Sequence, residues 1–240
     1  MKKLLKDIIR KTLKIFNLQL SYYKNSRMNY LKAIESRGIN LIFDVGANTG
    51  QFALSVFEDD YQGKIISFEP TSNVYKELTR NAEKFYKWKI HERAAVGEAC
   101  GKVAINVAGN SALSSSVLKM GKLHEENAPD SKYVNIEDVK LLTIDSIFAD
   151  YFMQSDKCLL KIDVQGYEEQ VLNGALNSIK KIDAVKIECS IFSLYEGDKT
   201  FEHYFQFFEQ NGFALFDMEP AFANPVTGRL LQFDALFVRL

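Results

Sequence analysis

The chain has 240 residues with 30 Lys and Arg against 31 Asp and Glu, a near-neutral balance that argues against an extended nucleic-acid-binding surface. Its composition, 47% hydrophobic and 25% charged, excludes general disorder, and the length favours one α/β domain over two small ones. Three cysteines without a C-x-x-C pair exclude a disulfide framework and a cysteine-rich zinc site, and they favour a reducing, cytoplasmic environment.

The N-terminus is basic and has the periodicity of a helix. Residues 1–14 contain six Lys or Arg side chains and one acid, Asp7, with apolar residues between them at helical spacing. We predict an amphipathic helix whose apolar face packs on the domain, which is the commoner use of such helices. The alternative is peripheral contact of residues 1–20 with an anionic membrane surface, such as the inner face of a cell membrane. The charges interrupt the apolar run, which excludes a signal peptide.

The rest of the chain alternates between strand-like and helix-like segments. Repeated β-α units predict an α/β fold with a mostly parallel sheet and helices on both faces. Helical periodicity predicts helices at 51–58, 72–85 with Ser72 as N-cap, 171–179 with an interruption at Gly174, and 201–210. Short apolar runs predict strands at 41–45, 64–69, 88–92, 102–107, 159–164, 184–189, 213–218 and 231–238.

The stretch 108–133 is the longest without clear periodicity, and it contains four serines between 111 and 116. A loop of that length in a compact domain usually forms a lid or a binding loop, or is disordered. We expect the choice of substrate to depend on this segment.

The first strand-to-helix turn, Phe43–Gly50, has the strongest chemical signal. Gly46 and Gly50 let the backbone turn sharply and approach a ligand closely. The dinucleotide fingerprint G-x-G-x-x-G is absent, because Asn48 stands at its second glycine. Asp44 would repel a pyrophosphate but could accept hydrogen bonds from a ligand ammonium group. The turn therefore favours a ligand with an amino-acid moiety and no phosphates.

A second acid follows at the end of the next strand. Glu69 stands 25 residues after Asp44, where a carboxylate in a doubly wound fold accepts the hydroxyls of a ribose. S-adenosylmethionine combines the amino acid with the ribose and has no phosphate. The competing interpretation is a tight turn followed by a solvated glutamate.

Five motifs follow one another in the chain: D-V-G-A-N-T-G at 44–50, S-F-E-P at 67–70, R-A-A-V-G at 93–97, K-I-D-V-Q-G-Y-E at 161–168 and F-D-A-L-F-V at 233–238. In this order they resemble the FkbM family of S-adenosylmethionine-dependent methyltransferases. The resemblance runs from about residue 40 to the C-terminus and leaves the first 35 or so residues outside. It implies a class I Rossmann-like fold with a seven-stranded sheet, and O-methylation, often of sugars in polysaccharides or glycolipids or of natural-product hydroxyls.

The same resemblance assigns cofactor contacts. The periodicity of the chain predicts one domain with an N-terminal helical extension, which we place at residues 1–38, and the resemblance implies a methyltransferase domain over 39–240. Gln165 departs from the pattern, since the family often has Glu there. The implied cofactor residues are Asp44, Gly46, Asn48 and Gly50 around the methionine part, Glu69 at the ribose, and Ala94, Ala95 and Val96 beside the adenine.

Two further carboxylates end neighbouring strands. Asp163 is our candidate for the general base that takes the proton from the acceptor alcohol, with Glu188 as a second catalytic carboxylate. Together they could also hold a divalent cation such as magnesium, which would lower the pKa of the alcohol. The structural alternatives are a helix cap for Asp163 and, for Glu188, an ion pair with Lys161 or Lys186.

Three functions compete at this point. An O-methyltransferase acting on a hydroxyl-bearing small molecule or glycan leads. A nicotinamide-dependent oxidoreductase is disfavoured by Asn48 and Asp44, and a non-catalytic adenosyl-ligand-binding partner in glycan assembly is the non-enzymatic alternative. The histidines show no metal-ligand spacing; His203 is expected to pack in its aromatic helix, while His124 could reach the acceptor.

Overall fold

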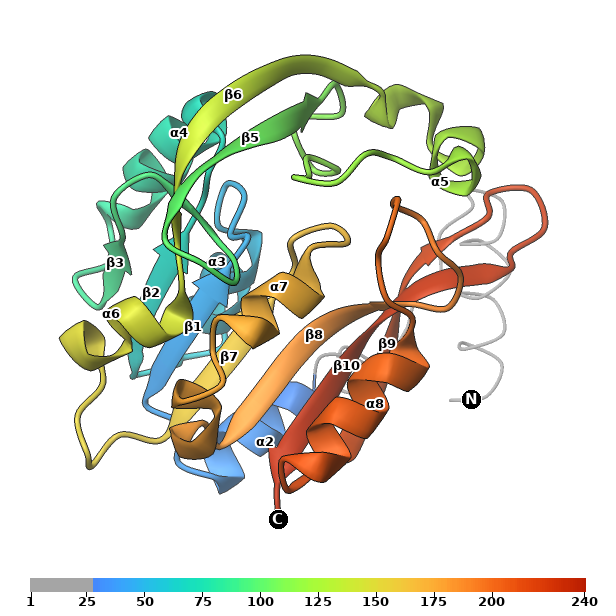
Figure 1. Cartoon of the computed structure of the whole chain (residues 1–240). Helices are drawn as coiled ribbons and strands as arrows, with labels where there is room; N and C mark the ends of the chain where they lie inside the picture. Colours follow the sequence, from blue (N-terminus) through green and yellow to red (C-terminus); the bar gives the residue numbers. More distant parts are fainter. Residues whose placement is uncertain (1–27) are drawn as a thin grey trace, which may run out of the picture.

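The computed structural model describes residues 28–240 (Figure 1). The amphipathic helix expected within residues 1–20 lies outside the described residues. Within residues 28–240, no helix is long and apolar enough to cross a membrane.

A seven-stranded sheet forms the centre of the domain, with the strands in the order β3-β2-β1-β7-β8-β10-β9. Strands β1, β2, β3, β7 and β8 pair in parallel, whereas β10 runs antiparallel to both of its neighbours. From β1 the chain builds outward through β2 and β3, then returns to place β7 on the other side of β1. The bounds are β1 (Leu41–Val45), β2 (Lys64–Phe68), β3 (Trp88–Ile90), β7 (Cys158–Ile162), β8 (Ala184–Ser190), β9 (Phe213–Ala223) and β10 (Leu230–Arg239).

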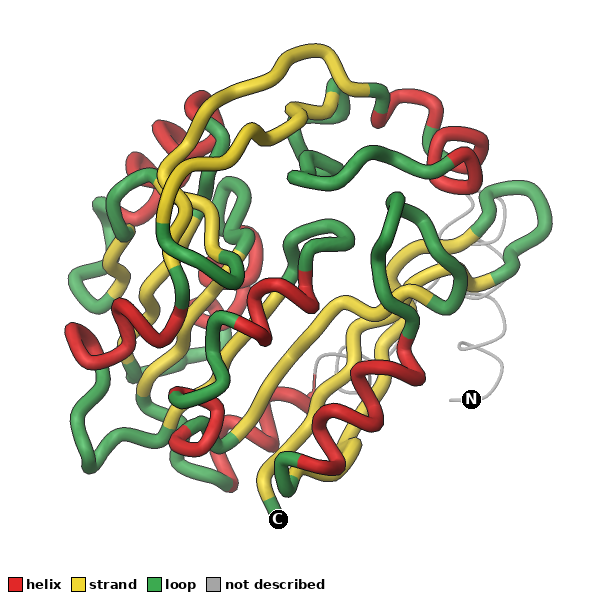
Figure 2. Tube along the Cα trace, viewed as in Figure 1, coloured by secondary structure: helices red, strands yellow, loops and turns green. Residues whose placement is uncertain are grey.

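Helices cover both faces of this sheet, as the alternating pattern predicts (Figure 2). One face packs against α2 (Met28–Ser36), α3 (Gln51–Glu58) and α4 (Ser72–Ala82). The other face packs against α6 (Ile144–Tyr151), α7 (Glu168–Asn173) and α8 (Phe201–Gln210). Because α2 contributes buried side chains to the core, the last part of the predicted extension packs on the domain.

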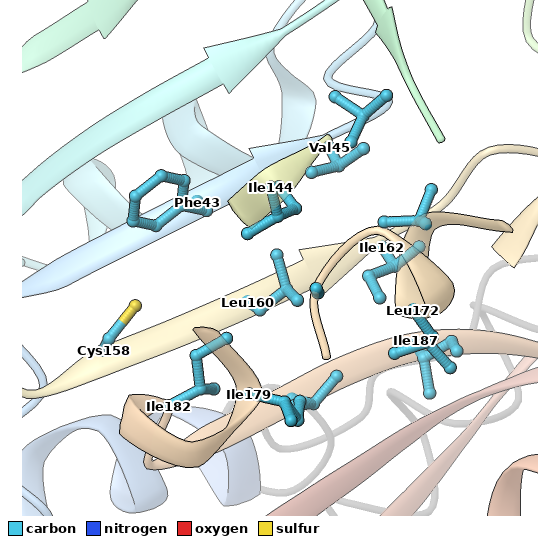
Figure 3. Close-up of a cluster of buried hydrophobic side chains, with 14 of the residues drawn as sticks. Phe43, Val45, Ile144, Cys158, Leu160, Ile162, Leu172, Ile179, Ile182 and Ile187 are labelled. Carbon is cyan, nitrogen blue, oxygen red and sulfur yellow. The ribbon is translucent and has the colours of Figure 1, made fainter. Parts of the chain in front are cut away.

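Apolar side chains of the central strands fill the space under these helices (Figure 3). Phe43 of β1 is fully buried and stacks on Phe148 of α6, with ring centroids 5.3 Å apart. Leu160 and Ile162 continue the same layer on β7. Strands that are buried on both faces appear in the sequence as continuous apolar runs. The end of each run therefore marks where its strand ends.

A second, three-stranded sheet was not expected from the sequence. Its order is β4-β6-β5, with β4 (Ala94–Val96), β5 (Gly101–Ala108) and β6 (Tyr133–Leu142). In Figure 1, β5 and β6 arch over the end of the central sheet where the parallel strands finish. The alternating pattern of β6 is weak because five of its ten residues are exposed, so neither β6 nor the helix α6 after it was predicted.

Three local expectations need correction. The stretch 108–133 is a sequence of turns that includes a short helix, α5 (Lys122–Asn127), and a 3-10 turn (Pro129–Ser131). The N-cap of α4 is Thr71, and Ser72 is the first helical residue. The helix predicted at 171–179 runs instead over Glu168–Asn173, because Gly174 ends it and a 3-10 turn follows.

Candidate active site

A cavity of about 390 Å³ opens where β1, β2, β4 and β7 end. This edge is the topological switch point of the sheet, because the chain leaves β1 toward β2 on one side and returns through β7 on the other. Six predicted cofactor residues and one predicted catalytic residue line the cavity: Gly46, Asn48, Glu69, Ala94, Ala95, Val96 and Asp163.

Gly46 allows β1 and β7 to end close together. It has a φ of +73°, and a Cβ added to it would lie 1.8 Å from the main-chain oxygen of Asp163. Asn48 also has a positive φ, 48°, and its side chain accepts a hydrogen bond from the Thr49 amide. The turn therefore needs Gly at 46 for space, while Asn at 48 suits the left-handed conformation.

Glu69 is buried, and its carboxylate holds the two loops of the cavity together. Oε2 accepts a hydrogen bond from the Asn48 amide at 3.0 Å, and Oε1 accepts from the amide and hydroxyl of Thr71 at 2.8 and 2.6 Å. Burial raises the pKa of Glu69, and these hydrogen bonds oppose that rise. A carboxylate offers about four acceptor positions, so with three in use Oε2 retains one for a ligand hydroxyl.

Asp44 occupies a different position from the one expected. It is fully buried and is absent from the cavity lining; its Oδ2 accepts a hydrogen bond from Ser67, and its Oδ1 lies 3.2 Å from Lys161 Nζ. Lys161 also donates to the Gly46 oxygen at 2.9 Å and lies 3.5 Å from Asp163 Oδ2. Asp44 is thus placed to act on the cavity through Lys161 rather than by accepting a ligand ammonium group.

Lys161 is buried among opposite charges and was not among the predicted site residues. Burial alone would lower the pKa of its ammonium group, but the carboxylates of Asp44 and Asp163 outweigh that effect, and the pKa is raised. Its position could have identified it, because it lies two residues before Asp163 on a buried apolar strand and a buried lysine needs a carboxylate partner.

Gly50 also lies outside the cavity lining. It begins α3 with a φ of +94°, and an added Cβ would lie 2.3 Å from the ring of Trp88. Its role is to let the helix start against β3, one layer behind the ligand space.

Asp163 and Glu188 are joined through an amide. Gln165 Nε2 donates to Asp163 Oδ1 at 2.9 Å and to Glu188 Oε2 at 2.8 Å. The Asp163 side chain is 37% exposed and faces the cavity, whereas Glu188 lies behind it and is absent from the lining. Burial raises the pKa of Glu188 well above its usual range, and the negative charge of Asp163 adds to the rise.

The structural alternatives for these two carboxylates are not supported. Helix α7 has no side-chain cap, so Asp163 does not cap it. Lys161 pairs with Asp44 and Asp163, and Lys186 pairs with Asp234, so neither of the two lysines forms an ion pair with Glu188.

Glu168 fixes the loop that carries Gln165. Its Oε1 accepts hydrogen bonds from the amides of Val164 and Gly166 at 3.0 and 3.2 Å, and burial raises its pKa to about 7. Gln165 itself has a φ of 57°. The loop between β7 and α7 is therefore held by a buried carboxylate that was not among the predicted site residues.

The small sheet closes the other side of the cavity. Glu137 of β6 accepts hydrogen bonds from the amide and hydroxyl of Ser72 at 2.9 and 2.8 Å and from Arg93 at 2.8 Å. These contacts tie β6 to the start of α4. Ile105 of β5 and the loop over residues 112–117 supply an apolar wall, with Ala112, Leu113 and Val117 in the lining.

The histidines do not form part of the cavity lining. His124 is buried between the rings of Tyr195 and Phe222, which excludes the expected approach to an acceptor in this conformation. His203 lies 3.2 Å from Glu169 on the surface of α8. Among residues 28–240, no group of three or more His, Cys, Asp or Glu side chains is arranged to hold a metal ion.

The sheet order, the antiparallel β10 and the cavity at the switch point together define the class I Rossmann-like methyltransferase fold. A family model described as "Methyltransferase FkbM domain" matches residues 44–215. The chain belongs to the FkbM methyltransferase family.

Similar proteins include one curated relative and many solved structures. Hexuronic acid methyltransferase AglP of Haloferax volcanii is 22% identical over 158 residues, which cover 64% of this chain and 57% of the relative. The match therefore spans little more than half the length of that relative. TehB from Haemophilus influenzae covers 95% of this chain and 65% of its own, with a TM-score of 0.49 and 10% identity. Sp1610 from Streptococcus pneumoniae, solved with S-adenosyl-L-methionine, covers 87% and 72%, with a TM-score of 0.46 and 10% identity.

Proposed function

We propose that this protein is an S-adenosylmethionine-dependent O-methyltransferase whose acceptor is a sugar hydroxyl. The observation that carries the proposal is one cavity lined at one end by Asn48, Glu69 and Ala94 and at the other by Asp163. Both a buried carboxylate suited to a ribose and a more exposed carboxylate suited to an acceptor alcohol open into that space.

The cofactor end has the chemistry that an adenosyl ligand requires. Glu69 retains an acceptor position for a ribose hydroxyl, and Ala94 and Ala95 are small, apolar neighbours for a flat base. Gly46 brings the main chain of the turn to the cavity wall without a side chain. When bound, S-adenosylmethionine would supply an electrophilic methyl group on sulfur.

The acceptor end is where this chain's residues would act on a proton. An alcohol is a poor nucleophile until a base accepts its proton as the new bond forms. Asp163 is the exposed member of its carboxylate pair, and its Oδ1 is held by Gln165. Asp163 would accept the proton from the hydroxyl, while the apolar side chains of Ile105, Leu113 and Val117 limit access of water.

The sugar as acceptor is supported by the relative that methylates a hexuronic acid and by the family resemblance. If the glycan is lipid-linked, residues 1–20 would hold the enzyme at an anionic membrane surface by their basic side chains. Each such residue contributes on the order of 1 kcal/mol near the surface. Comparing full-length and truncated protein for salt-sensitive sedimentation with anionic vesicles tests that contact; equal sedimentation refutes it.

The cofactor part is tested by calorimetric titration with S-adenosylhomocysteine. Glu69→Ala should weaken binding by roughly 1.5–3 kcal/mol, the range for a hydrogen bond to a charged group. NAD titrated in parallel should not bind. Unchanged affinity for S-adenosylhomocysteine in a folded variant would remove Glu69 from the ribose site, and tight NAD binding would favour an oxidoreductase.

The catalytic part is tested by turnover of a panel of neutral sugars and uronic acids. Asp163→Asn should keep cofactor affinity while lowering turnover by about 10²–10⁴, the range for general acid-base catalysis. Normal turnover in the variant would place the base elsewhere. If a chelator inhibits turnover and added magnesium restores it, the result would support the version in which a divalent cation lowers the pKa of the alcohol. A wild-type protein that binds the cofactor but methylates nothing would favour the non-catalytic partner.

A further inference from the structure

We infer that Gln165 is a positioning residue for the catalytic carboxylate, and that the hydroxyl of Tyr195 holds its amide in place. The inference rests on the proposed function, in which Asp163 accepts the acceptor's proton. It concerns a position at which this chain departs from the residue that the family often has.

The Gln165 side chain uses both ends in hydrogen bonds. Nε2 donates one proton to Asp163 Oδ1 at 2.9 Å and the other to Glu188 Oε2 at 2.8 Å. Oε1 accepts from the Tyr195 hydroxyl at 2.9 Å. An amide has two donor protons, so its NH₂ group is fully used by the two carboxylates.

The Tyr195 hydroxyl holds the other end of the amide. Tyr195 is 1% exposed, and its hydroxyl donates its proton to Gln165 Oε1. Ionised carboxylates only accept hydrogen bonds, so Asp163 and Glu188 require the NH₂ group on their side, and the phenol proton then meets Oε1 on the other side. If the amide turned over, Asp163 would lose the Gln165 donor and Glu188 would keep only that of Gln232.

The carboxylate side of the network is supported from a third strand. Gln232 of β10 also donates to Glu188 Oε2, at 3.0 Å. Glu188 therefore has two amide donors on one oxygen, and it serves as a fixed anchor from which Gln165 reaches Asp163. The main chain of Gln165 is itself held, because its oxygen accepts from Ser116 at 2.7 Å.

Several charged and titratable groups surround this network and affect the charge it can carry. They are Lys161 on β7, Glu168 on α7, Lys186 on β8, Tyr195 in the loop after β8 and Asp234 on β10. Asp163 pairs with Lys161 on one side, and Glu188 is surrounded by acids, so an additional negative charge is unfavourable here.

Neutrality is what distinguishes Gln at this position from Glu. A glutamate of the same size would place a third carboxyl group between Asp163 and Glu188. It could donate a hydrogen bond to Asp163 only when protonated, because an ionised carboxylate has no proton to donate, and its single proton could not serve Glu188 as well. The link to Asp163 would then form below the pKa of that group and be lost above it.

Two substitutions and one matched control test the inference. Tyr195→Phe removes only the hydroxyl, and Gln165→Glu replaces the neutral NH₂ donor by a titratable carboxyl oxygen of similar size. The control is Tyr204→Phe, since Tyr204 is also 1% exposed and its hydroxyl has no hydrogen-bond partner among the described residues. All three variants are first checked for thermal melting and for affinity toward S-adenosylhomocysteine, which should match the wild type.

Tyr195→Phe should lower kcat by about 10- to 100-fold, the cost of misplacing a catalytic group by roughly 1 Å, with little change in KM. Gln165→Glu should add a descending limb to the pH profile of kcat/KM that the wild type lacks. Tyr204→Phe should behave as wild type. A measurement that needs no acceptor is the exchange with water of the Gln165 side-chain amide protons, which should be faster in Tyr195→Phe alone.

The outcomes separate this inference from the proposed function. Wild-type turnover, together with Tyr195→Phe and Gln165→Glu profiles that match the wild type, overturns the positioning role and leaves the methyltransferase intact. Failure of the wild type to bind S-adenosylhomocysteine or to turn over any sugar overturns the proposed function. In that case the amide exchange alone decides whether Tyr195 holds Gln165, and equal exchange in the two tyrosine variants refutes it.

Discussion

Replacing Lys161 by methionine should strongly destabilise the domain. The substitution keeps most of the side-chain volume but leaves Asp44, which is fully buried, without its cation. At the observed 3.2 Å and an effective dielectric constant of about 20, the attraction between the two charges is about 5 kcal/mol. Losing one member of such a buried pair typically costs about 3–5 kcal/mol, because the other charge stays buried and unpaired.

A double-mutant cycle in urea measures this coupling. Asp44→Asn alone should cost less than Lys161→Met, because Lys161 keeps Asp163 and the Gly46 oxygen. The double variant should be more stable than the sum of the two single effects predicts, by about 2 kcal/mol. The exposed pair Lys119 and Glu196, 2.8 Å apart, is the matched control and should show no measurable coupling. Additive effects at Lys161 and Asp44 would refute the assigned role of Asp44.

Two further outcomes follow from single positions. Gly46→Ala should destabilise the domain by at least about 3 kcal/mol, because the φ of Gly46 is positive and the new Cβ would meet the backbone of Asp163. The control is Gly101→Ala, whose new Cβ meets nothing within 4 Å. Equal urea midpoints for the two variants would contradict the argument. Burial lowers the pKa of His124 from its ordinary value of 6.5, so the unfolded chain takes up a proton before the folded one does. Stability should therefore fall as the pH drops below about 6.5, by up to roughly 1.4 kcal/mol per pH unit. His124→Leu should flatten that dependence in urea midpoints measured between pH 7.5 and 5.5, and an unchanged slope would place the sensitive group elsewhere.

The sequence alone determined most of the central sheet and the cofactor end of the cavity. Its strands are buried on both faces, so apolar runs such as 41–45 mark them, and the residues just after each run must lie at one edge of a parallel sheet. That is why Gly46, Glu69 and Asp163 could be named from their positions in the chain, before any contact between them was known.

Only the tertiary structure decided what lies behind and above those residues. Asp44 and Asp163 have the same residue type and both lie near the end of a strand, but Asp44 is inside β1, opposite Lys161 and buried against it, whereas Asp163 follows the last residue of β7 and opens into the cavity. The second sheet escaped prediction because β6 is half exposed and its partners are distant in sequence. The bridge from Asp163 through Gln165 to Tyr195 joins residues up to 32 positions apart, and no local pattern encodes such contacts. Periodicity in the sequence shows which side chains of a segment face the core, whereas contacts between polar side chains depend on where the folded chain brings them together.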